Sequence, residues 1–381
     1  MNKHIILLKS NLGARGGLEK YTLRLANAFK ENHCKVTILT TTSPKNSLPQ
    51  LEDIEVIPLF KNTKLSALNL YLFNQKCKKW IQNHSPGIIF GLDRNKTQTY
   101  YRAGNGVHAA YLKSRKKIES GLKTMTFSMN PLHQLILHYE KSAFENVDLK
   151  TLFTNSHMVK KDILNHYNTL STKIHVVHNG VEWNEFKEPF FSWQELRPSL
   201  FTSLRLDPIN FQLLFIGHGY KRKGLELLLH ALATIKEEKF QLSIVGKDKQ
   251  QLYFKTLINT LGLTNKVHIF GERSDIRSFY QACDALLIPS IYDPFANVTV
   301  EALAMGLSVL SSSFNGGHEV LTPDSGIIIN DLFNKEALAC NLKDLFLRRK
   351  TKESALKIRD SIKYLDFSHQ LTTIVQEIIK K

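Results

Sequence analysis

The sequence predicts an α/β protein made of two Rossmann-like domains that face an interdomain cleft. The chain has 381 residues, which is more than one ordinary hydrophobic core organises. Two stretches, about two hundred residues apart, repeat one plan of apolar strand, glycine loop, amphipathic helix and second apolar strand. Continuous apolar strands that alternate with amphipathic helices are typical of parallel sheets covered on both faces.

The first repeat lies at the start of the chain. Its opening strand is the apolar run HIILL at residues 4–8, and a glycine loop follows at residues 13–17. The next segment carries apolar Leu18, Leu25 and Phe29 at helical spacing, which predicts an amphipathic helix before the second strand.

The second repeat opens the other domain. It comprises a strand at 211–216, a glycine loop at 217–224, a helix at 225–235 and a strand at 240–245. Before this repeat, the turn signal Asn179-Gly180 places the hinge between the two domains near residues 180–189. We therefore expect domains at 1–185 and 186–360, with a final helix at 361–381 that packs back on the first domain.

Composition limits the kind of partner. The chain has 51 Lys and Arg against 34 Asp and Glu, a net charge of +17, which favours anionic partners such as nucleic acid, an acidic membrane surface or a phosphorylated small molecule. No apolar run approaches the roughly 20 residues of a membrane span, so we expect a cytoplasmic protein. The four cysteines are too widely spaced for a zinc or redox motif.

The chemistry concentrates in two loops of the second domain. The loop GHGYKRKG at 217–224 places Arg222 and Lys223 beside a predicted helix start, an arrangement that suits an anion. Further on, YDPFANVTVEALAMG carries two acids, Asp293 and Glu301, with Asn297 as the expected N-cap of a helix from residue 298 to about 305. Paired acids also suit glycoside hydrolysis, but the basic surroundings favour a phosphorylated leaving group.

These stretches, together with GARGG and FNGGHEVL, resemble the retaining family 4 glycosyltransferases of the GT-B fold. The stretch YRAGNGVHAAYLKSRKK at 101–117 is similar to the branch that contains the lipopolysaccharide inner-core glucosyltransferase. The resemblance spans nearly the whole chain. It implies a retaining, metal-independent hexosyltransferase that moves glucose from UDP-glucose to a lipopolysaccharide core or related lipid-linked glycan acceptor, with no cofactor.

The resemblance also implies roles for the residues that match the family. Two candidate catalytic residues are His108 and Asp293, the latter in a position where the family usually has glutamate. Arg222 and Lys223 would hold the donor diphosphate, while Glu301 would bind the ribose. The full set of expected donor-binding residues is Gly16, Gly17, Arg222, Lys223, Phe270, Arg273, Ala296, Asn297, Val298 and Glu301.

Other interpretations stay open at this point. One is a transferase or epimerase of the same fold that uses another nucleotide sugar, and another is a basic nucleic-acid-binding protein. The second lacks a recognisable nucleic-acid module, so no nucleic acid is expected. The basic and apolar segment at 111–144 suits an anionic membrane surface, which would make the protein peripheral on the cytoplasmic face of the inner membrane. An ordinary amphipathic helix beside a solvated basic loop accounts for the same pattern.

Overall fold

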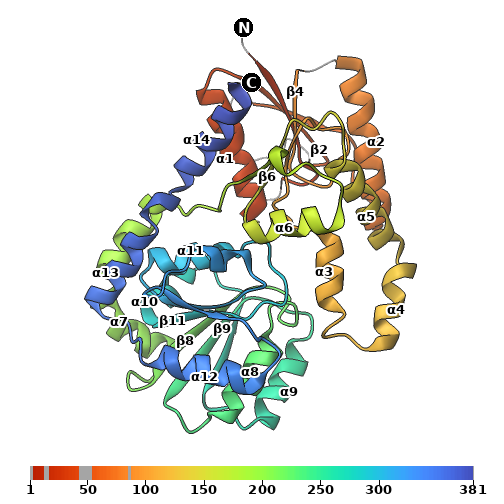
Figure 1. Ribbon diagram of the computed structural model, residues 1–381. Coiled ribbons are helices and arrows are strands. Elements are labelled where there is room, and N and C mark those ends of the chain that lie inside the picture. The colour runs from red at the N-terminus through yellow and green to blue at the C-terminus, as the bar shows by residue number, and fades with distance from the viewer. Residues whose placement is uncertain (1–2, 13–16, 43–53, 85–86, 381) are drawn as a thin grey trace. The chain divides into compact units, whose positions relative to one another are not determined.

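The computed structural model describes residues 3–12, 17–42, 54–84 and 87–380 (Figure 1). The chain forms two compact units. The N-terminal domain comprises Met1–His178 and Ser368–Lys381, and the C-terminal domain comprises Asn179–Phe367. Each domain has its own parallel sheet with helices around it, which confirms the predicted pair of Rossmann-like domains.

The N-terminal domain has a sheet of seven described strands in the order β3-β2-β1-β4-β5-β6-β7, all paired in parallel. The residues of the five inner strands are mostly buried, as apolar strands covered on both faces require, whereas the two edge strands are partly exposed. The strands are β1 (His4–Leu8), β2 (Lys35–Thr40), β3 (Glu55–Pro58), β4 (Ile88–Gly91), β5 (Tyr100–Arg102), β6 (Thr151–Thr154) and β7 (Ile174–Val176).

The described helices of the N-terminal domain connect these strands and include the last helix of the chain. They are α1 (Gly17–Glu31), α2 (Ser66–His84), α3 (His108–Arg115), α4 (Gly121–Met129), α5 (Pro131–Phe144), α6 (His157–His166) and α14 (Phe367–Ile379). Between β5 and β6 the chain makes a long excursion through α3, α4 and α5, which extends away from the sheet (Figure 1). Asn130 caps α5 by accepting hydrogen bonds from the backbone N–H groups of Leu132 and His133.

The C-terminal domain has a parallel sheet of six strands in the order β10-β9-β8-β11-β12-β13. The strands are β8 (Phe211–Ile216), β9 (Phe240–Val245), β10 (Val267–Gly271), β11 (Ala285–Ile288), β12 (Ser308–Ser312) and β13 (Gly326–Ile329). The bounds of β8 and β9 are those predicted from the sequence. The strand order changes direction at β8 and β11, and the loops after these two strands therefore lie next to each other.

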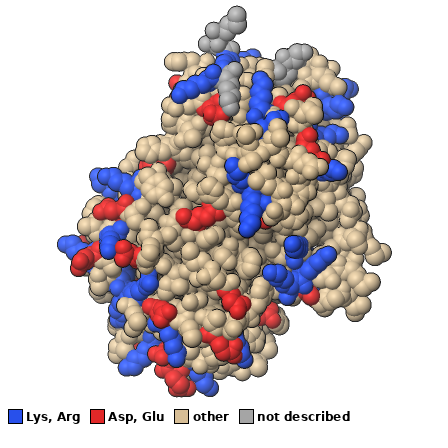
Figure 2. Space-filling view, in the orientation of Figure 1, with Lys and Arg blue, Asp and Glu red and all other residues tan. Residues whose placement is uncertain are grey.

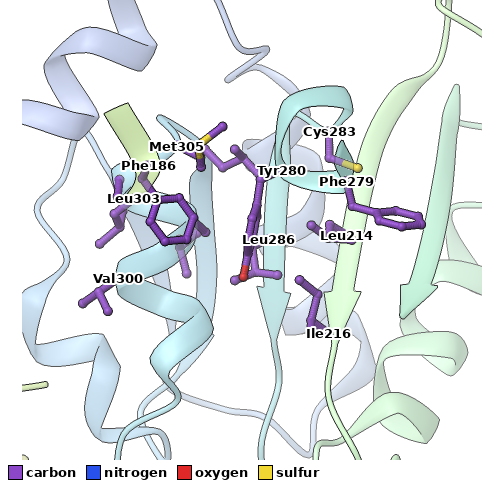
Figure 3. Close-up of a cluster of buried hydrophobic side chains, with 14 of the residues drawn as sticks. Phe186, Leu214, Ile216, Phe279, Tyr280, Cys283, Leu286, Val300, Leu303 and Met305 are labelled. Atoms are coloured by element: carbon purple, nitrogen blue, oxygen red, sulfur yellow. The ribbon is translucent and has the colours of Figure 1, made fainter. Parts of the chain in front are cut away.

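Seven α-helices are described in the C-terminal domain. They are α7 (Lys187–Leu204), α8 (Leu225–Thr234), α9 (Gln251–Thr260), α10 (Ile276–Ala282), α11 (Asn297–Ala304), α12 (Lys335–Phe346) and α13 (Lys352–Ser361). Figure 3 shows the core between α10, α11 and the sheet, where Tyr280 lies among Leu286, Leu303 and Phe186. These side chains are at least nine-tenths buried, so α10 and α11 are held firmly at the sheet.

Candidate functional site

The loops that follow β8, β11 and β12 are tied together at the carboxyl edge of the C-terminal sheet. The backbone N–H of Ile291 donates to the carbonyl of Arg222 at 3.0 Å, and that of Asp293 donates to the carbonyl of Phe314 at 2.9 Å. Loops at this edge form the ligand sites of parallel α/β sheets. The basic loop and the acidic loop predicted from the sequence are therefore neighbours.

Arg222, Lys223 and Asp293 form one ionic cluster, in which Arg222 is half-buried. The Nζ atom of Lys223 donates to Oδ2 of Asp293 at 2.6 Å, and a guanidinium nitrogen of Arg222 donates to the same oxygen at 3.2 Å. Lys223 and Asp293 are both at least nine-tenths buried. Burial opposes ionisation of Asp293, but the charges of Lys223 and Arg222 outweigh it and hold the pKa of that carboxyl below its usual range. The cluster thus carries two cations against one anion.

Backbone geometry explains the glycine that ends the basic loop. Gly224 has φ +75°, and a Cβ atom at this position would lie 1.7 Å from the carbonyl oxygen of Pro289. Only glycine fits such a close approach. The loop is braced at its other side by Tyr220, whose hydroxyl donates to the carbonyl of Gly246 at 2.8 Å and whose N–H donates to Asp248 at 2.7 Å. The two cations therefore project from a rigid loop.

The start of α11 differs from the prediction. The helix begins at Asn297, and the N-cap is Ala296, so the prediction that Asn297 caps the helix was wrong. Asn315 holds this helix start from another loop, because its buried Oδ1 accepts from the N–H of Ala296 at 2.9 Å and its Nδ2 donates to Ser311 at 2.9 Å. The Asn297 side chain instead accepts a hydrogen bond from Asn179 at 2.7 Å.

This arrangement changes what the backbone of α11 offers. The N–H of Ala296 is engaged by Asn315, whereas Asn297 and Val298 lie in the first helical turn, where backbone N–H groups lack intrahelical acceptors. Anions bind at such helix starts. Asn315 was not assigned a role from the sequence, although the Asn-Gly-Gly run that contains it marks a tight turn.

Glu301 lies within α11 and has a defined partner. Its Oε2 accepts a hydrogen bond from the Tyr280 hydroxyl at 2.8 Å, and burial together with this carboxylate raises the pKa of Tyr280. The other two predicted residues lie on or after β10. Phe270 packs edge-to-face on Phe279, with ring centroids 4.9 Å apart, and Arg273 forms two hydrogen bonds to Asp275 at 2.8 and 2.7 Å.

The predicted residues of the N-terminal domain are Gly16, Gly17 and His108. Gly16 lies outside the described residues, and Gly17 is the first residue of α1. His108 begins α3, two residues after Gly106, which has φ +66°. The His108 side chain is buried, and burial, followed by the nearby charge of Arg94, lowers its pKa to about 3. This imidazole is therefore neutral at physiological pH.

Two residues that sequence reasoning missed hold His108 in place. Its backbone N–H donates to both carboxylate oxygens of buried Glu140, at 2.8 and 2.9 Å, and its Nε2 lies 3.0 Å from Nδ1 of His133. Glu140 also accepts from Tyr167 at 3.0 Å and from Arg94 at 3.4 Å. Since one nitrogen of the His108–His133 pair must donate and the other accept, the contact couples the tautomer of one ring to that of the other.

Figure 2 shows how charged side chains are distributed over one face of the molecule. On the face shown in Figure 2, basic side chains occur in separate groups and are interspersed with acidic ones. A nucleic-acid-binding surface is usually a continuous basic patch or stripe. The distribution on this face therefore gives no support to the nucleic-acid interpretation.

Comparison with known proteins identifies the family. Residues 15–184 match the family model described as Glycosyltransferase Family 4, and residues 197–360 match that described as Glycosyl transferases group 1. The chain belongs to the family 4 glycosyltransferases. It is similar to an uncharacterised glycosyltransferase of Methanocaldococcus jannaschii, with 26% identity over 318 residues that cover 80% of this chain and 79% of the relative. It is also similar to the lipopolysaccharide glucosyltransferase WaaG of Escherichia coli, with 24% identity over 337 residues, or 85% and 84% of the two chains.

Solved structures agree on the fold. The crystal structure of WaaG, a glycosyltransferase involved in lipopolysaccharide biosynthesis, superimposes with a TM-score of 0.80 at 19% identity and covers 99% of this chain and 100% of that one. HepE of Anabaena, solved in complex with UDP and glucose, gives a TM-score of 0.69 at 18% identity with full coverage of both chains. The predicted GT-B fold is thereby confirmed, and the protein is a glycosyltransferase enzyme.

Proposed function

We propose that the protein is a retaining hexosyltransferase that transfers glucose from UDP-glucose to a lipopolysaccharide core or related glycan acceptor, without a metal ion. The name of the WaaG relative supports glucose and the lipopolysaccharide acceptor. The complex of the HepE neighbour with UDP and glucose supports the donor. No helix among the described residues is long and apolar enough to cross a membrane.

The observation that carries the proposal is the cluster of Arg222 and Lys223 around Asp293, at a rigid loop and close to the start of α11. In the reaction the bond between the sugar C1 and the UDP β-phosphate oxygen breaks, and negative charge develops on the departing diphosphate. Two fixed cations and the first-turn N–H groups of α11 can stabilise that charge without reorganisation. This chemistry accounts for a metal-independent transfer.

Retention requires that the acceptor hydroxyl attack C1 on the face that the diphosphate leaves. In our proposal the acceptor oxygen bonds to C1, and its proton passes to the departing β-phosphate oxygen. Asp293, ionised beside its two cations, orients the donor sugar through its remaining lone pairs. His108 is the contribution of the N-terminal domain: as a neutral imidazole it can accept or donate a hydrogen bond to a sugar hydroxyl.

The remaining predicted residues would hold the donor. Glu301, already oriented by Tyr280, would accept hydrogen bonds from the ribose hydroxyls. Asn297 and Val298 would present backbone donors to the phosphates, while Ala296 would contribute packing since its N–H is engaged. Gly16 and Gly17 are proposed to contact the diphosphate, and Phe270 and Arg273 the base.

Donor choice and stereochemistry can be tested together. A thermal-shift screen with UDP-, GDP- and ADP-glucose should show stabilisation with UDP-glucose alone. Transfer from UDP-glucose to a lipopolysaccharide core acceptor should give an α-linked product by NMR, and the rate should be unchanged by EDTA. Selective stabilisation by GDP- or ADP-glucose would redirect the proposal to another nucleotide sugar. A β-linked product would refute retention, and loss of rate in EDTA would refute metal independence.

We also propose that α4 docks the enzyme on an anionic membrane surface. Its side chains Leu122, Met125 and Met129 follow helical spacing and are 83%, 70% and 80% exposed. An unpartnered apolar stripe of this kind, flanked by lysines, is typical of helices that lie in a membrane interface. The flanking exposed lysines are Lys113, Lys116, Lys117 and Lys123.

Vesicle co-sedimentation tests this docking. The variant Leu122→Ser/Met125→Ser/Met129→Ser should lose most binding to vesicles that contain phosphatidylglycerol, while binding to pure phosphatidylcholine stays weak throughout. A matched control, Leu252→Ser/Leu347→Ser, removes two equally exposed apolar side chains from the C-terminal domain. A specific role for α4 would be refuted if both variants lost vesicle binding equally, or if neither variant lost it.

A further inference from the structure

The N-terminal domain contains a second basic feature, at the edge of its sheet where the strands begin. A cavity of about 790 Å³ lies there. Four lysines from four separate segments line it: Lys78 of α2, Lys96 before β5, Lys150 directly before β6, and Lys173 directly before β7. We call this cavity the lysine pocket. Neither the family resemblance nor the proposed transfer reaction uses any of these residues.

The four ammonium groups have little to neutralise them. Among the described residues, none of the four forms an ion pair with a carboxylate, and Asp148 is the one acidic side chain in the lining. Lys173 donates weakly to the carbonyl of Val147 at 3.4 Å, and Lys96 lies 5.8 Å from the ring centre of Tyr139. Both of these lysines are half-buried, so their charge is partly removed from water without a compensating anion.

Such an arrangement has an electrostatic cost that a ligand would relieve. Lys150 and Lys173 precede adjacent parallel strands, since β6 pairs with β7 through Leu152 and Ile174. Like charges brought together at the end of paired strands repel each other, and a concave surface concentrates their positive potential. A volume of this size falls within the range of sites for small organic ligands.

We propose that the lysine pocket binds a small ligand that carries two or more phosphate charges. The four lysines provide charge-assisted hydrogen bonds to phosphate oxygens. Ile81, Ile89 and Leu149 supply an apolar floor on which the rest of the ligand can pack. The pocket is built at the beginning of strands of the N-terminal domain, and none of its lining residues is among those proposed to hold the donor.

Matched charge variants test the proposal. The pocket variant, Lys78→Gln/Lys150→Gln, removes two exposed lysines that line the pocket. The control variant, Lys79→Gln/Lys141→Gln, removes two exposed lysines of the same domain that do not line the pocket. Both changes alter the net charge equally, and all four positions are solvent-exposed, so both variants should fold with unchanged circular dichroism. Calorimetric titration with inorganic tripolyphosphate should give a Kd about tenfold weaker for the pocket variant and nearly unchanged for the control.

A second arm separates a free ligand from a lipid headgroup. The pocket variant and the control variant are each combined with the α4 substitutions, which remove the proposed membrane docking. Their binding to vesicles that contain phosphatidic acid is then measured. If the pocket variant binds tripolyphosphate more weakly than the control variant does, the result supports a soluble ligand. If the pocket variant is weaker only in vesicle binding, the result supports a lipid phosphate. Equal weakening of both variants, or no binding of either probe to the unaltered protein, overturns the proposal. Neither readout depends on glycosyl transfer.

Discussion

Lys223 offers the sharpest test of the proposed chemistry, because its effect on the stability of the fold and its effect on kcat can be separated by a second substitution. The perturbation is Lys223→Met, which keeps most of the length of the side chain and removes its charge. Asp293 would then stay buried with Arg222 as its remaining cation, 3.2 Å away. Loss of one partner from a buried pair costs about 3–5 kcal/mol, and we expect about 3 kcal/mol here because Arg222 still compensates.

We expect Lys223→Met to lower kcat by more than the loss of folded protein alone would explain. Removing one charged donor from the stabilisation of a developing anion typically lowers kcat by about a hundredfold to a thousandfold. The double variant Lys223→Met/Asp293→Asn removes both charges, so it should recover most of the lost stability. It should remain as inactive as the single variant, because no cation returns to the departing diphosphate.

Two measurements check this reasoning. Urea unfolding, followed by tryptophan fluorescence, reports stability, and initial rates at saturating UDP-glucose report kcat. Two of the three tryptophans, Trp183 and Trp193, lie in the C-terminal domain. Lys255→Met is the control, since Lys255 is an exposed lysine of α9. If the double variant regains near-normal transfer, Lys223 serves only to neutralise Asp293, and the proposed stabilisation of the leaving group is wrong.

Three further predictions concern side chains that position or stabilise the domains. His133→Phe removes the hydrogen bond to His108 and should lower kcat by roughly tenfold to a hundredfold with little change in KM, whereas His133→Gln, which keeps a hydrogen-bonding group, should recover part of the loss in steady-state assays. Tyr280→Phe removes one hydrogen bond to the carboxylate of Glu301 and should raise the KM for UDP-glucose several-fold more than it lowers kcat, in the same assays. Burial, assisted by the charge of a neighbouring arginine, lowers the pKa of Lys350 to about 7, so the unfolded chain binds more protons between pH 7 and 9 and stability rises with pH there. The window ends near pH 9 because burial raises the pKa of Cys77 and Cys283, and these thiols act in the opposite direction above it. The slope should reach at most about 1.4 kcal/mol per pH unit in urea unfolding, and it should disappear in Lys350→Met; a slope that persists in the variant contradicts this assignment.

The sequence predicts well those features that depend on local patterns. Runs of consecutive apolar residues identified β1, β8 and β9 with their observed bounds, because strands covered on both faces admit few polar side chains. The glycine loop after β8 marked the carboxyl edge of the C-terminal sheet. The basic loop at 217–224 and the acid at Asp293 were placed correctly on neighbouring loops, since both follow parallel strands of one sheet.

The contacts that decide how the site works lie beyond local patterns. Lys223 meets Asp293 across 70 positions of sequence, and no periodicity reveals that one carboxylate oxygen serves two cations. The assignment of the helix cap failed for the same reason: Asn297 has the best local chemistry, but Asn315 reaches the N–H of Ala296 from another loop. Glu140 lies in α5, and nothing in the sequence of that helix indicates that its carboxylate accepts hydrogen bonds from the backbone N–H of His108.

The pairing of Asp293 with two cations also explains how the proposed diphosphate site can hold its two positive charges together when no ligand is bound. Two buried or half-buried cations on a rigid loop would repel each other, and Asp293 offsets much of that repulsion while leaving a net positive charge. Because the aspartate is held by hydrogen bonds of 2.6 and 3.2 Å and its backbone is tied to the loop after β12, the cations are fixed before any substrate arrives. Fixed charges stabilise a developing anion more than mobile ones do, since they need no rearrangement during the reaction. The shorter side chain of aspartate suits this position, because Lys223 and Arg222 both reach it and no extra methylene has to be accommodated among buried neighbours.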